Sequence, residues 1–295
     1  MRRLNLSDGS VLFGLTDAAP APAAWDYSFP EAKLGDHPHV VERWLPDGMF
    51  RTRFTVWAFA QNGRIIVVDA GIGAGPSPYF NNMSGRLPIE MAAAGLDIAA
   101  VEHVLFTHFH LDHVGWATNP DGHAFFPNAR YHAPEAELAY WRQYGTQSAL
   151  PHHVDAFERH IAPLIASNCL QGEKPGEIVV RIGRREISYL SVPGHTAGHC
   201  AVVIEGDDEI LLIAADSWHS PAQIAVPDWC HRADRDPLQA CRSRIALGEW
   251  ARERQAVVAA GHFPEEIAFG SIEGNDAGQR AFVPIDSIKD RRRST

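Results

Sequence analysis

Residues 101–116 read VEHVLFTHFHLDHVGW, and the architecture of the chain can be worked outward from this stretch. Its first part, residues 101–107, is a short apolar run, which predicts a buried β-strand. The strand leads directly into the hexapeptide HFHLDH at residues 108–113. Four side chains of that hexapeptide can bind a metal ion, namely His108, His110, Asp112 and His113. Such a density favours a metal site over a polar loop of hydrogen-bonded histidines.

The spacing of these four side chains allows them to converge on a metal site. Side chains alternate along a strand, so His108 and His110 can face the same side. The chain must then turn, which lets Asp112 and His113 reach a neighbouring point before Gly115. Imidazole nitrogen and carboxylate oxygen are ligands suited to zinc, iron or manganese. The sequence therefore predicts a metal centre at the end of this strand.

Three later apolar runs also end on a residue that can bind metal. Residues 189–194, 210–215 and 257–261 lead to His195, Asp216 and His262, respectively. Taken singly each is weak, because a lone histidine after glycine is more often structural. Strand ends of an α/β fold meet in one crevice, so these residues and the hexapeptide together supply seven donors. Seven donors are enough for two divalent ions with an open position, and we expect zinc, with iron or manganese as alternatives.

The ordered motifs resemble those of the metallo-β-lactamase superfamily, over about residues 50–265. The resemblance implies an α/β fold of the αββα type, a sandwich of two sheets with the metal site at one edge. It also implies that one metal is held by His108, His110 and His195, a second by Asp112, His113 and His262, and that Asp216 bridges the two. Asp69, in the tetrapeptide VDAG at residues 68–71, matches an acid that supports the site in this family, or it caps a turn.

Within the superfamily, the chain is similar to the lactonase branch. The similarity rests on DHVGW at residues 112–116, FPNARY at residues 126–131 and PGHTAGH at residues 193–199. That branch includes N-acyl homoserine lactonases and related ester or organophosphate hydrolases. N-acyl homoserine lactonases carry a tyrosine three residues after the bridging aspartate, where this chain has His219. Zinc β-lactamases often carry cysteine at the position of Asp216, which disfavours antibiotic hydrolysis.

The resemblance implies hydrolysis of a small-molecule lactone or carboxylic ester by water that two metal ions activate. In that reaction we expect Asp112 to pass a proton to the leaving alkoxide and His219 to hydrogen-bond the oxyanion. His219 is equally consistent with a surface histidine beside Trp218. Two other activities share the hexapeptide: a mono-iron oxidoreductase of the persulfide dioxygenase type, and a phosphodiester or phosphotriester hydrolase. Metal analysis separates the first of these from a two-zinc hydrolase.

The other histidines and the aromatic neighbours of the predicted ligands are less informative. His199 is expected to support the site or to start a strand, and His103 is expected to lie partly in the core. Three histidines of a predicted helical region are expected to face solvent, although an insertion there could cover the site: His152, His153 and His160. Three aromatic residues either wall an acyl pocket or pack in the core: Phe109, Trp116 and Trp218.

Short β-branched runs predict further strands, and residues 62–63 (Asn-Gly) and 206–208 predict hairpin turns. The expected strands are residues 54–60, 64–68, 101–107, 186–192, 200–205, 209–214 and 256–260. Helical patterns alternate with them, which favours an α/β sandwich over an all-β barrel; they cover residues 88–94, 134–144, 154–167 and 237–254. No change in composition marks a linker, so we expect a single domain over residues 1–295, with its core at about 50–265 and a helical insertion at about 134–172.

Composition limits the partners and the location that we expect. The 295 residues are 45% hydrophobic and 21% charged, as in ordinary globular proteins, and the net charge of -10 disfavours nucleic acid or an anionic membrane as a partner. The one basic run, residues 291–293, is expected to be a solvated tail. No stretch approaches the roughly 18 apolar residues of a membrane span, and the first residues lack the apolar region of a secretory leader. The four cysteines form no C-x-x-C pair, so we expect a reducing, cytoplasmic location; homodimer formation is left open.

Overall fold

The computed structural model of the protein describes residues 1–148, 150–206, 209–274 and 280–288. The basic run at residues 291–293 and the turn residues 207–208, for which the sequence makes predictions, lie outside the described residues. Within the described ranges, no helix combines the length and the apolar character that crossing a membrane requires.

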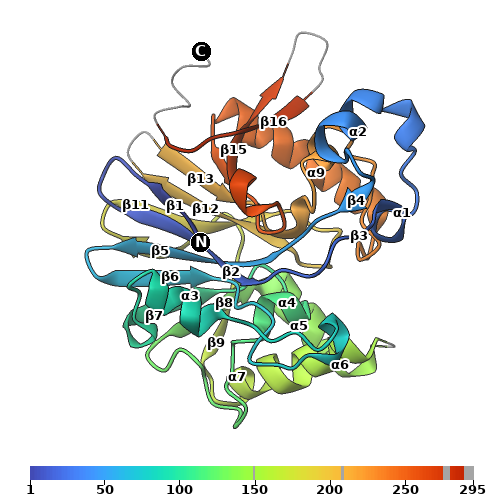
Figure 1. The fold of residues 1–295 in the computed structure, drawn as a ribbon. Helices are drawn as coiled ribbons and strands as arrows, with labels where there is room; N and C mark the ends of the chain where they lie inside the picture. Colours follow the sequence, from blue (N-terminus) through green and yellow to red (C-terminus); the bar gives the residue numbers. More distant parts are fainter. Residues whose placement is uncertain (149, 207–208, 275–279, 289–295) are drawn as a thin grey trace.

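Two seven-stranded sheets form the centre of the molecule (Figure 1). The first has the spatial order β1 (Arg2–Asn5), β2 (Val11–Ala18), β5 (Phe54–Gln61), β6 (Arg64–Val68), β7 (Val101–Leu105), β8 (Arg130–Pro134) and β9 (Leu170–Glu173). The second has the order β10 (Ile178–Ile182), β11 (Arg185–Ser191), β12 (Cys200–Gly206), β13 (Glu209–Ile213), β14 (Val257–Ala259), β15 (Phe269–Gly274) and β16 (Arg280–Pro284). A separate two-stranded pair consists of β3 (Ala23–Ala24) and β4 (Met49–Phe50).

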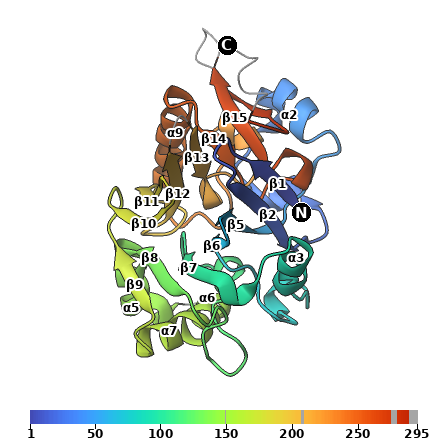
Figure 2. The same cartoon turned by 90° about the vertical axis from the view of Figure 1, so that its left-hand side faces the viewer.

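Helices cover the outer face of each sheet, which makes four layers (Figures 1 and 2). The first sheet packs against α3 (Leu87–Ala93), α4 (Leu111–Val114), α5 (Glu135–Tyr144) and α7 (Ala162–Ala166), and the second against α9 (Pro237–Glu253). The shorter helices are α1 (Trp25–Ser28), α2 (Pro38–Trp44), α6 (Pro151–Asp155) and α8 (Ala222–Ala225), and a π-helix (Ala156–Ile161) joins α6 to α7. The predicted α/β fold of the αββα type is confirmed.

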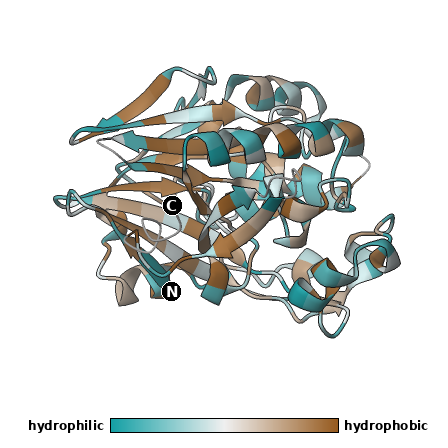
Figure 3. Cartoon of the chain, turned by 90° about the horizontal axis from the view of Figure 1, so that it is seen from above, coloured by the Kyte–Doolittle hydropathy of each residue, from teal (hydrophilic) through white to brown (hydrophobic). Residues whose placement is uncertain are grey.

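The central strands are buried on both faces. In β6, Ile66 and Val68 belong to the core between the sheets, whereas Ile65 and Val67 belong to the core beneath the helices. Because both faces are buried, the strand is a continuous apolar run without alternation, which made it recognisable from the sequence. Burial of one such side chain contributes about 1.5–3 kcal/mol. Figure 3 shows the apolar colours concentrated on the strands.

The hairpin predicted at residues 62–63 is confirmed. β5 and β6 pair antiparallel up to Gln61 and Arg64, and the two residues between them have positive φ, 52° at Asn62 and 80° at Gly63. A two-residue turn of this kind needs positive φ at both positions to match the twist of its strands, which explains the Asn-Gly pair. The hairpin directs the end of β6 toward the edge of the sheet where the candidate site lies.

The sheets extend further along the chain than the core expected at residues 50–265, since β1, β2, β15 and β16 lie outside that range. Gly14 interrupts the pattern of β2 because a side chain has no room there: a Cβ would lie 2.8 Å from the ring of Trp57. The helical insertion is shorter than the expected residues 134–172. Its last helix ends at Ala166, and β9 then forms an edge of the first sheet.

Candidate metal centre

Strands from both sheets end at one edge of the sandwich. β7 runs parallel to β6 and β8 in the first sheet, and β13 runs parallel to β14 in the second. Parallel strands place the residues that follow them at the same edge, where side chains can converge. His108 follows β7, Asp216 follows β13 and His262 follows β14, while His195 lies in the loop after β11. The seven predicted ligands fall into two groups of potential donors that share Asp216.

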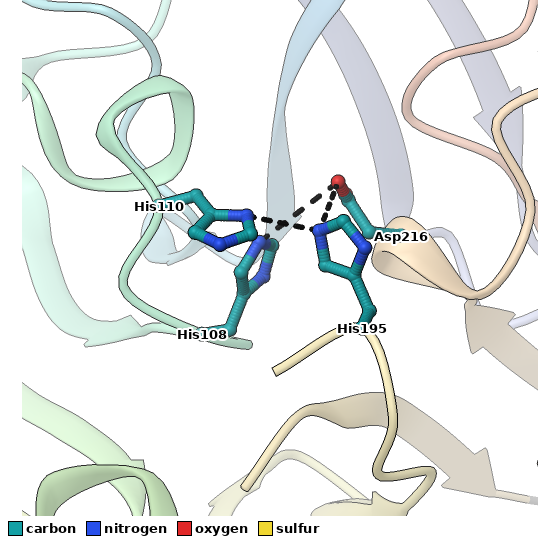
Figure 4. Close-up of side chains that lie close together, drawn as sticks. All are labelled: His108, His110, His195 and Asp216. Atoms are coloured by element: carbon teal, nitrogen blue, oxygen red, sulfur yellow. Dashed lines mark hydrogen bonds and ion pairs between the residues drawn. The ribbon is translucent and has the colours of Figure 1, made fainter. Parts of the chain in front are cut away.

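The first group consists of three histidines and one carboxylate (Figure 4). His195 Nε2 lies 2.9 Å from His110 Nδ1 and 3.1 Å from Asp216 Oδ2. His108 Nε2 lies 3.9 Å from the same oxygen. Ligands of a tetrahedral zinc ion, each about 2.1 Å from the metal, are about 3.4 Å from one another, so these separations suit an ion of that size.

The second group uses the other oxygen of the shared carboxylate. Asp216 Oδ1 lies 3.0 Å from His113 Nε2 and 3.0 Å from His262 Nε2. Asp112 Oδ2 lies 3.5 Å from His113 Nε2 and 3.9 Å from His262 Nε2. The structure therefore brings all seven predicted residues together, and each oxygen of Asp216 faces a different group.

The state of one ring nitrogen shows that a cation fits these donors. His108 Nε2 is buried and has no hydrogen-bond partner among the described residues. A buried polar atom without a partner costs about 1–3 kcal/mol, and a bound cation removes that cost. Nδ1 of the same ring already has a partner, the hydroxyl of Thr107 at 3.0 Å. These histidine and aspartate side chains are arranged so that they could hold a metal ion.

Acceptors fix the far nitrogens of three of the histidines. Nδ1 lies 2.8 Å from Asp69 in His113, 2.9 Å from Asp234 in His195, and 2.9 Å from the Arg53 carbonyl oxygen in His262. Carboxylate and carbonyl oxygens only accept, so each Nδ1 carries a hydrogen and each ring is held with its Nε2 directed into the site. Asp69 also accepts from the amide of Thr107 at 2.8 Å, so it supports a ligand and fastens the turn.

Burial and charge set the protonation of the site. Burial raises the pKa of Asp216, but the neighbouring histidines outweigh this effect and hold the pKa well below its usual range. Burial, together with a neighbouring histidine, keeps the pKa of His108 well below its usual range. An ionised carboxylate and a neutral imidazole are the forms that bind a cation. Of the seven residues only His110 and Asp112 are partly exposed, so solvent reaches the site from their side.

His219 lies inside the site. It is 4% exposed, so the alternative of a surface histidine beside Trp218 is wrong. Its Nε2 lies 3.2 Å from Asp216 Oδ2, and its Nδ1 is buried without a hydrogen-bond partner among the described residues. Burial lowers the pKa of His219 to about 4, so the ring is neutral at pH 7.

His231, which the sequence analysis missed, stacks on His219. The two ring centroids are 3.9 Å apart with an interplanar angle of 13°. His219 also lies parallel to His262, with centroids 5.0 Å apart and an angle of 5°. His231 comes from the loop between α8 and α9, where it follows no apolar strand, so no local pattern pointed to it.

Two buried side chains hold the loops that carry the donors. Glu137, in α5, accepts from the amide of Phe109 at 3.1 Å and from the amide of Gly198 at 2.9 Å, which joins the loops on either side of the first group. No sequence pattern indicated this role, because Glu137 resembles any acidic residue in the first turn of a helix. His199 Nε2 accepts from the amide of Asp216 at 3.3 Å, which is the supporting role expected for it.

The aromatic neighbours of the donors pack in the core. Phe109, Trp116 and Trp218 belong to hydrophobic clusters and are at most 8% exposed, which favours packing over an acyl pocket. His103 is partly buried, as expected. The expectation that the insertion histidines face solvent is wrong, because all three are half-buried and His153 stacks on His110 with centroids 5.2 Å apart.

The chain thus combines an αββα sandwich with a cluster of potential histidine and aspartate metal ligands at its edge. The sequence profile of the family described as "Metallo-beta-lactamase superfamily" matches residues 54–272. The chain belongs to the metallo-β-lactamase superfamily. No curated protein sequence matches it significantly.

Solved structures share this fold along nearly the whole chain. The hydrolase AbOPH of the beta lactamase superfamily is 21% identical, with a TM-score of 0.80 over 96% of this chain and 97% of that chain. The dizinc quorum-quenching lactonase AidC, in complex with a product, is 20% identical, with a TM-score of 0.77 over 96% and 97%. A probable metal-dependent hydrolase from Staphylococcus aureus is 18% identical, with a TM-score of 0.74 over 97% and 99%. At these identities the likeness establishes the fold, and the presence of lactonases agrees with the resemblance found in the sequence.

Proposed function

We propose that this chain is a dinuclear metal-dependent hydrolase that opens a lactone or cleaves a carboxylic ester. The observation that carries the proposal is the position of Asp216, whose two oxygens each face nitrogen donors of a separate group at 3.0 or 3.1 Å. A carboxylate shared in this way suits two ions better than one. Zinc is the proposed metal because the donors are nitrogen and oxygen atoms, and AidC is a dizinc enzyme. Iron and manganese suit the same donors.

We assign one metal ion to each of the two groups of donors. One ion would be held by His108, His110, His195 and Asp216, and the other by Asp112, His113, His262 and Asp216. Such ions, when bound, supply an activated water at neutral pH and a Lewis acid for the substrate carbonyl. The protein supplies rigid, oriented imidazoles, because acceptors on the far side fix their rings.

Asp112 and His219 are the proposed catalytic residues. The Asp112 side chain is 16% exposed, so its carboxylate can reach a bound substrate. There it would take up the proton that the attacking water loses and pass that proton to the leaving alkoxide oxygen. His219 is a neutral ring with one N–H, and its Nε2 lies 3.2 Å from Asp216 Oδ2, so that N–H would turn from the carboxylate toward the substrate oxygen that becomes negative. It occupies the position where N-acyl homoserine lactonases carry tyrosine, and we propose that its imidazole replaces the phenol in this role.

The proposed substrate is a small molecule with an ester or lactone carbonyl. The product complex of AidC supports this class, since that lactonase has the same fold. We further propose that the chain acts as a single domain whose helical insertion flanks the site. A cytoplasmic location is consistent with four free cysteines, and it remains part of the proposal.

Metal analysis of the purified protein, followed by a panel of lactones, aryl esters and phosphotriesters, tests the proposed function. We expect about two zinc ions per chain and hydrolysis of lactones or esters. One redox-active iron per chain would favour the persulfide dioxygenase type of activity, and turnover of phosphotriesters alone would favour a phosphoester hydrolase. Hydrolysis of no substrate on the panel by the metal-loaded protein would refute the proposal.

The shared carboxylate can be tested separately. Asp216→Ala removes a donor from both groups at once, so we expect it to lose metal from both and to lose nearly all activity. Elemental analysis and the same substrate panel measure both effects. Full retention of metal and activity would contradict the shared role of Asp216.

A further inference from the structure

A buried arginine connects the supports of two proposed ligands. Arg244 lies in α9 and is 2% exposed. Its Nη2 donates to Asp234 Oδ2 at 2.7 Å, and its Nε donates to the carbonyl of Ser217 at 2.8 Å. The remaining nitrogen, Nη1, donates to the carbonyl of Pro227. Every nitrogen of the guanidinium is therefore used, and no part of it faces solvent.

Asp234 contacts His195 as well as Arg244. Its side chain is 0% exposed, and its Oδ1 accepts from His195 Nδ1 at 2.9 Å. A backbone hydrogen bond also joins the two loops, since the amide of Arg235 donates to the carbonyl of His195 at 3.1 Å. With Nδ1 held, the ring cannot turn away from the site. Its Nε2 is thereby kept 3.1 Å from Asp216 Oδ2.

The second contact of Arg244 reaches the turn that carries Asp216. Ser217 follows Asp216 in a short 3-10 helix, Ala215–Ser217. Ala215 has a φ of 47°, a left-handed conformation that costs a non-glycine residue about 1–3 kcal/mol and needs support from its surroundings. The hydrogen bond from Arg244 to the Ser217 carbonyl supplies such support. One guanidinium thus connects the turn of Asp216 to the carboxylate behind His195.

Stability of the fold does not by itself account for this arrangement. A buried ion pair loses several kcal/mol of hydration per ion and is often no more stabilising than apolar side chains of the same volume. α9 already buries Leu247 and Ala251 in the core of the second sheet. A planar guanidinium, however, fixes the directions of several acceptors at once, which an ammonium group cannot do.

We propose that Arg244 and Asp234 are positioning residues that hold His195 and Asp216 at the separation a metal ion needs, and so set the metal affinity of the first donor group. The inference rests on the proposed function only in requiring that the donors bind a divalent ion. The second group shares Asp216 but has separate supports behind its two histidines, Asp69 and the Arg53 carbonyl, so its affinity should change less than that of the first group.

Zinc titration of the chelator-stripped protein against a chromophoric competitor tests this inference. Asp234→Asn preserves the size of the side chain, and we expect it to weaken binding of one of two ions about 10–100-fold. The absorption spectrum of the cobalt-substituted protein should shift as well, because it reports ligand geometry. Arg244→Lys keeps the charge and loses the planar fork, and we expect a loss in the same range. The loss of affinity in the double variant should be smaller than the product of the two single losses, since the contact between Arg244 and Asp234 is common to both changes.

Arg185→Lys is the matched control. Arg185 is also fully buried and paired, with Asp8 at 2.7 Å and Glu209 at 2.8 Å, but it begins β11 and so lies at the far end of that strand from the loop of His195. We expect Arg185→Lys to lower stability and to leave zinc affinity and the cobalt spectrum unchanged. Equal weakening in this control, or affinity within threefold of the parent protein in both Asp234→Asn and Arg244→Lys, would overturn the inference. Normal zinc affinity without any hydrolysis in the parent protein would instead refute the proposed function alone.

Discussion

Glu137→Gln tests how the loops that carry the donors are held together. The Glu137 carboxylate is 0% exposed and lies between α5 and two loops of the site. Its four hydrogen-bond partners are all donors: the amide of Phe109 at 3.1 Å, Trp141 Nε1 at 2.6 Å, the hydroxyl of Thr196 at 2.7 Å and the amide of Gly198 at 2.9 Å. Glutamine has the same shape, but its NH2 group must face two of these donors.

The cost of the substitution follows from these contacts. The hydroxyl of Thr196 can rotate and become an acceptor, so the NH2 group turns toward it and the amide of Gly198 loses its acceptor. A buried donor without a partner costs about 1–3 kcal/mol, and the two remaining hydrogen bonds weaken by about 1 kcal/mol each because their acceptor is neutral. The neutral amide is less costly to bury than a carboxylate, which offsets part of this sum. We expect the free energy of unfolding to fall by about 2–4 kcal/mol.

Urea denaturation of the metal-free protein, followed by tryptophan fluorescence, measures this difference. Glu135→Gln is the control, because Glu135 is exposed in the same helix. Phe109 lies between two proposed ligands, so Glu137→Gln should also lower the zinc content of the purified protein. A change in the free energy of unfolding below about 0.5 kcal/mol, the usual range for a surface substitution, would show that the four hydrogen bonds do not hold these loops.

Three further outcomes can be measured. Gly194→Ala should lower stability and zinc content, because Gly194 has a φ of +129° and a Cβ there would lie 2.2 Å from the amide nitrogen of Ala240. Gly35→Ala is the control and should change neither property, because a Cβ at Gly35 would meet open space. Normal zinc content in Gly194→Ala would contradict this prediction. Burial lowers the pKa of His160 to about 4 from 6.5, so the unfolded chain binds more protons between these values and stability falls as the pH drops through them. The urea midpoint of His160→Asn should therefore fall less steeply over that range, and an unchanged slope would reject the effect. Chelator treatment should lower the melting temperature and added zinc should restore it, since a ligand that binds only the folded state stabilises that state; an unchanged melting temperature would count against a bound ion.

The sequence predicted the strands whose pattern is strong and local. Residues 64–68 form a continuous apolar run next to an Asn-Gly turn, and both features come from contacts within a few residues. β2 was missed because Gly14 breaks its pattern, and the reason for that glycine is the ring of Trp57 on the neighbouring strand. β8 was missed because it is short and ends on Pro134. Patterns that depend on a partner strand cannot be read from one segment.

The same distinction applies to the candidate site. The donor residues could be predicted because each stands where a strand ends, and their roles as ligands stay predictions until a metal is measured. The residues that hold them could not be predicted. Asp234 is one of several charged residues in an ordinary loop, and its role depends on His195, 39 positions away in the chain. Arg244 looks like any arginine in a helix, because nothing in the helix itself shows that the guanidinium is buried.

The division of the donors between the two sheets has a consequence for how the protein is made. The hexapeptide at residues 108–113 follows a strand of the first sheet, while His195, Asp216 and His262 follow strands of the second. Neither half of the polypeptide contains a full set for even one ion. A nascent chain on the ribosome therefore cannot form the second group until residue 262 has emerged and both halves have docked. Metal ions would then bind only after the two halves have folded together, so metal uptake would be the last step of folding.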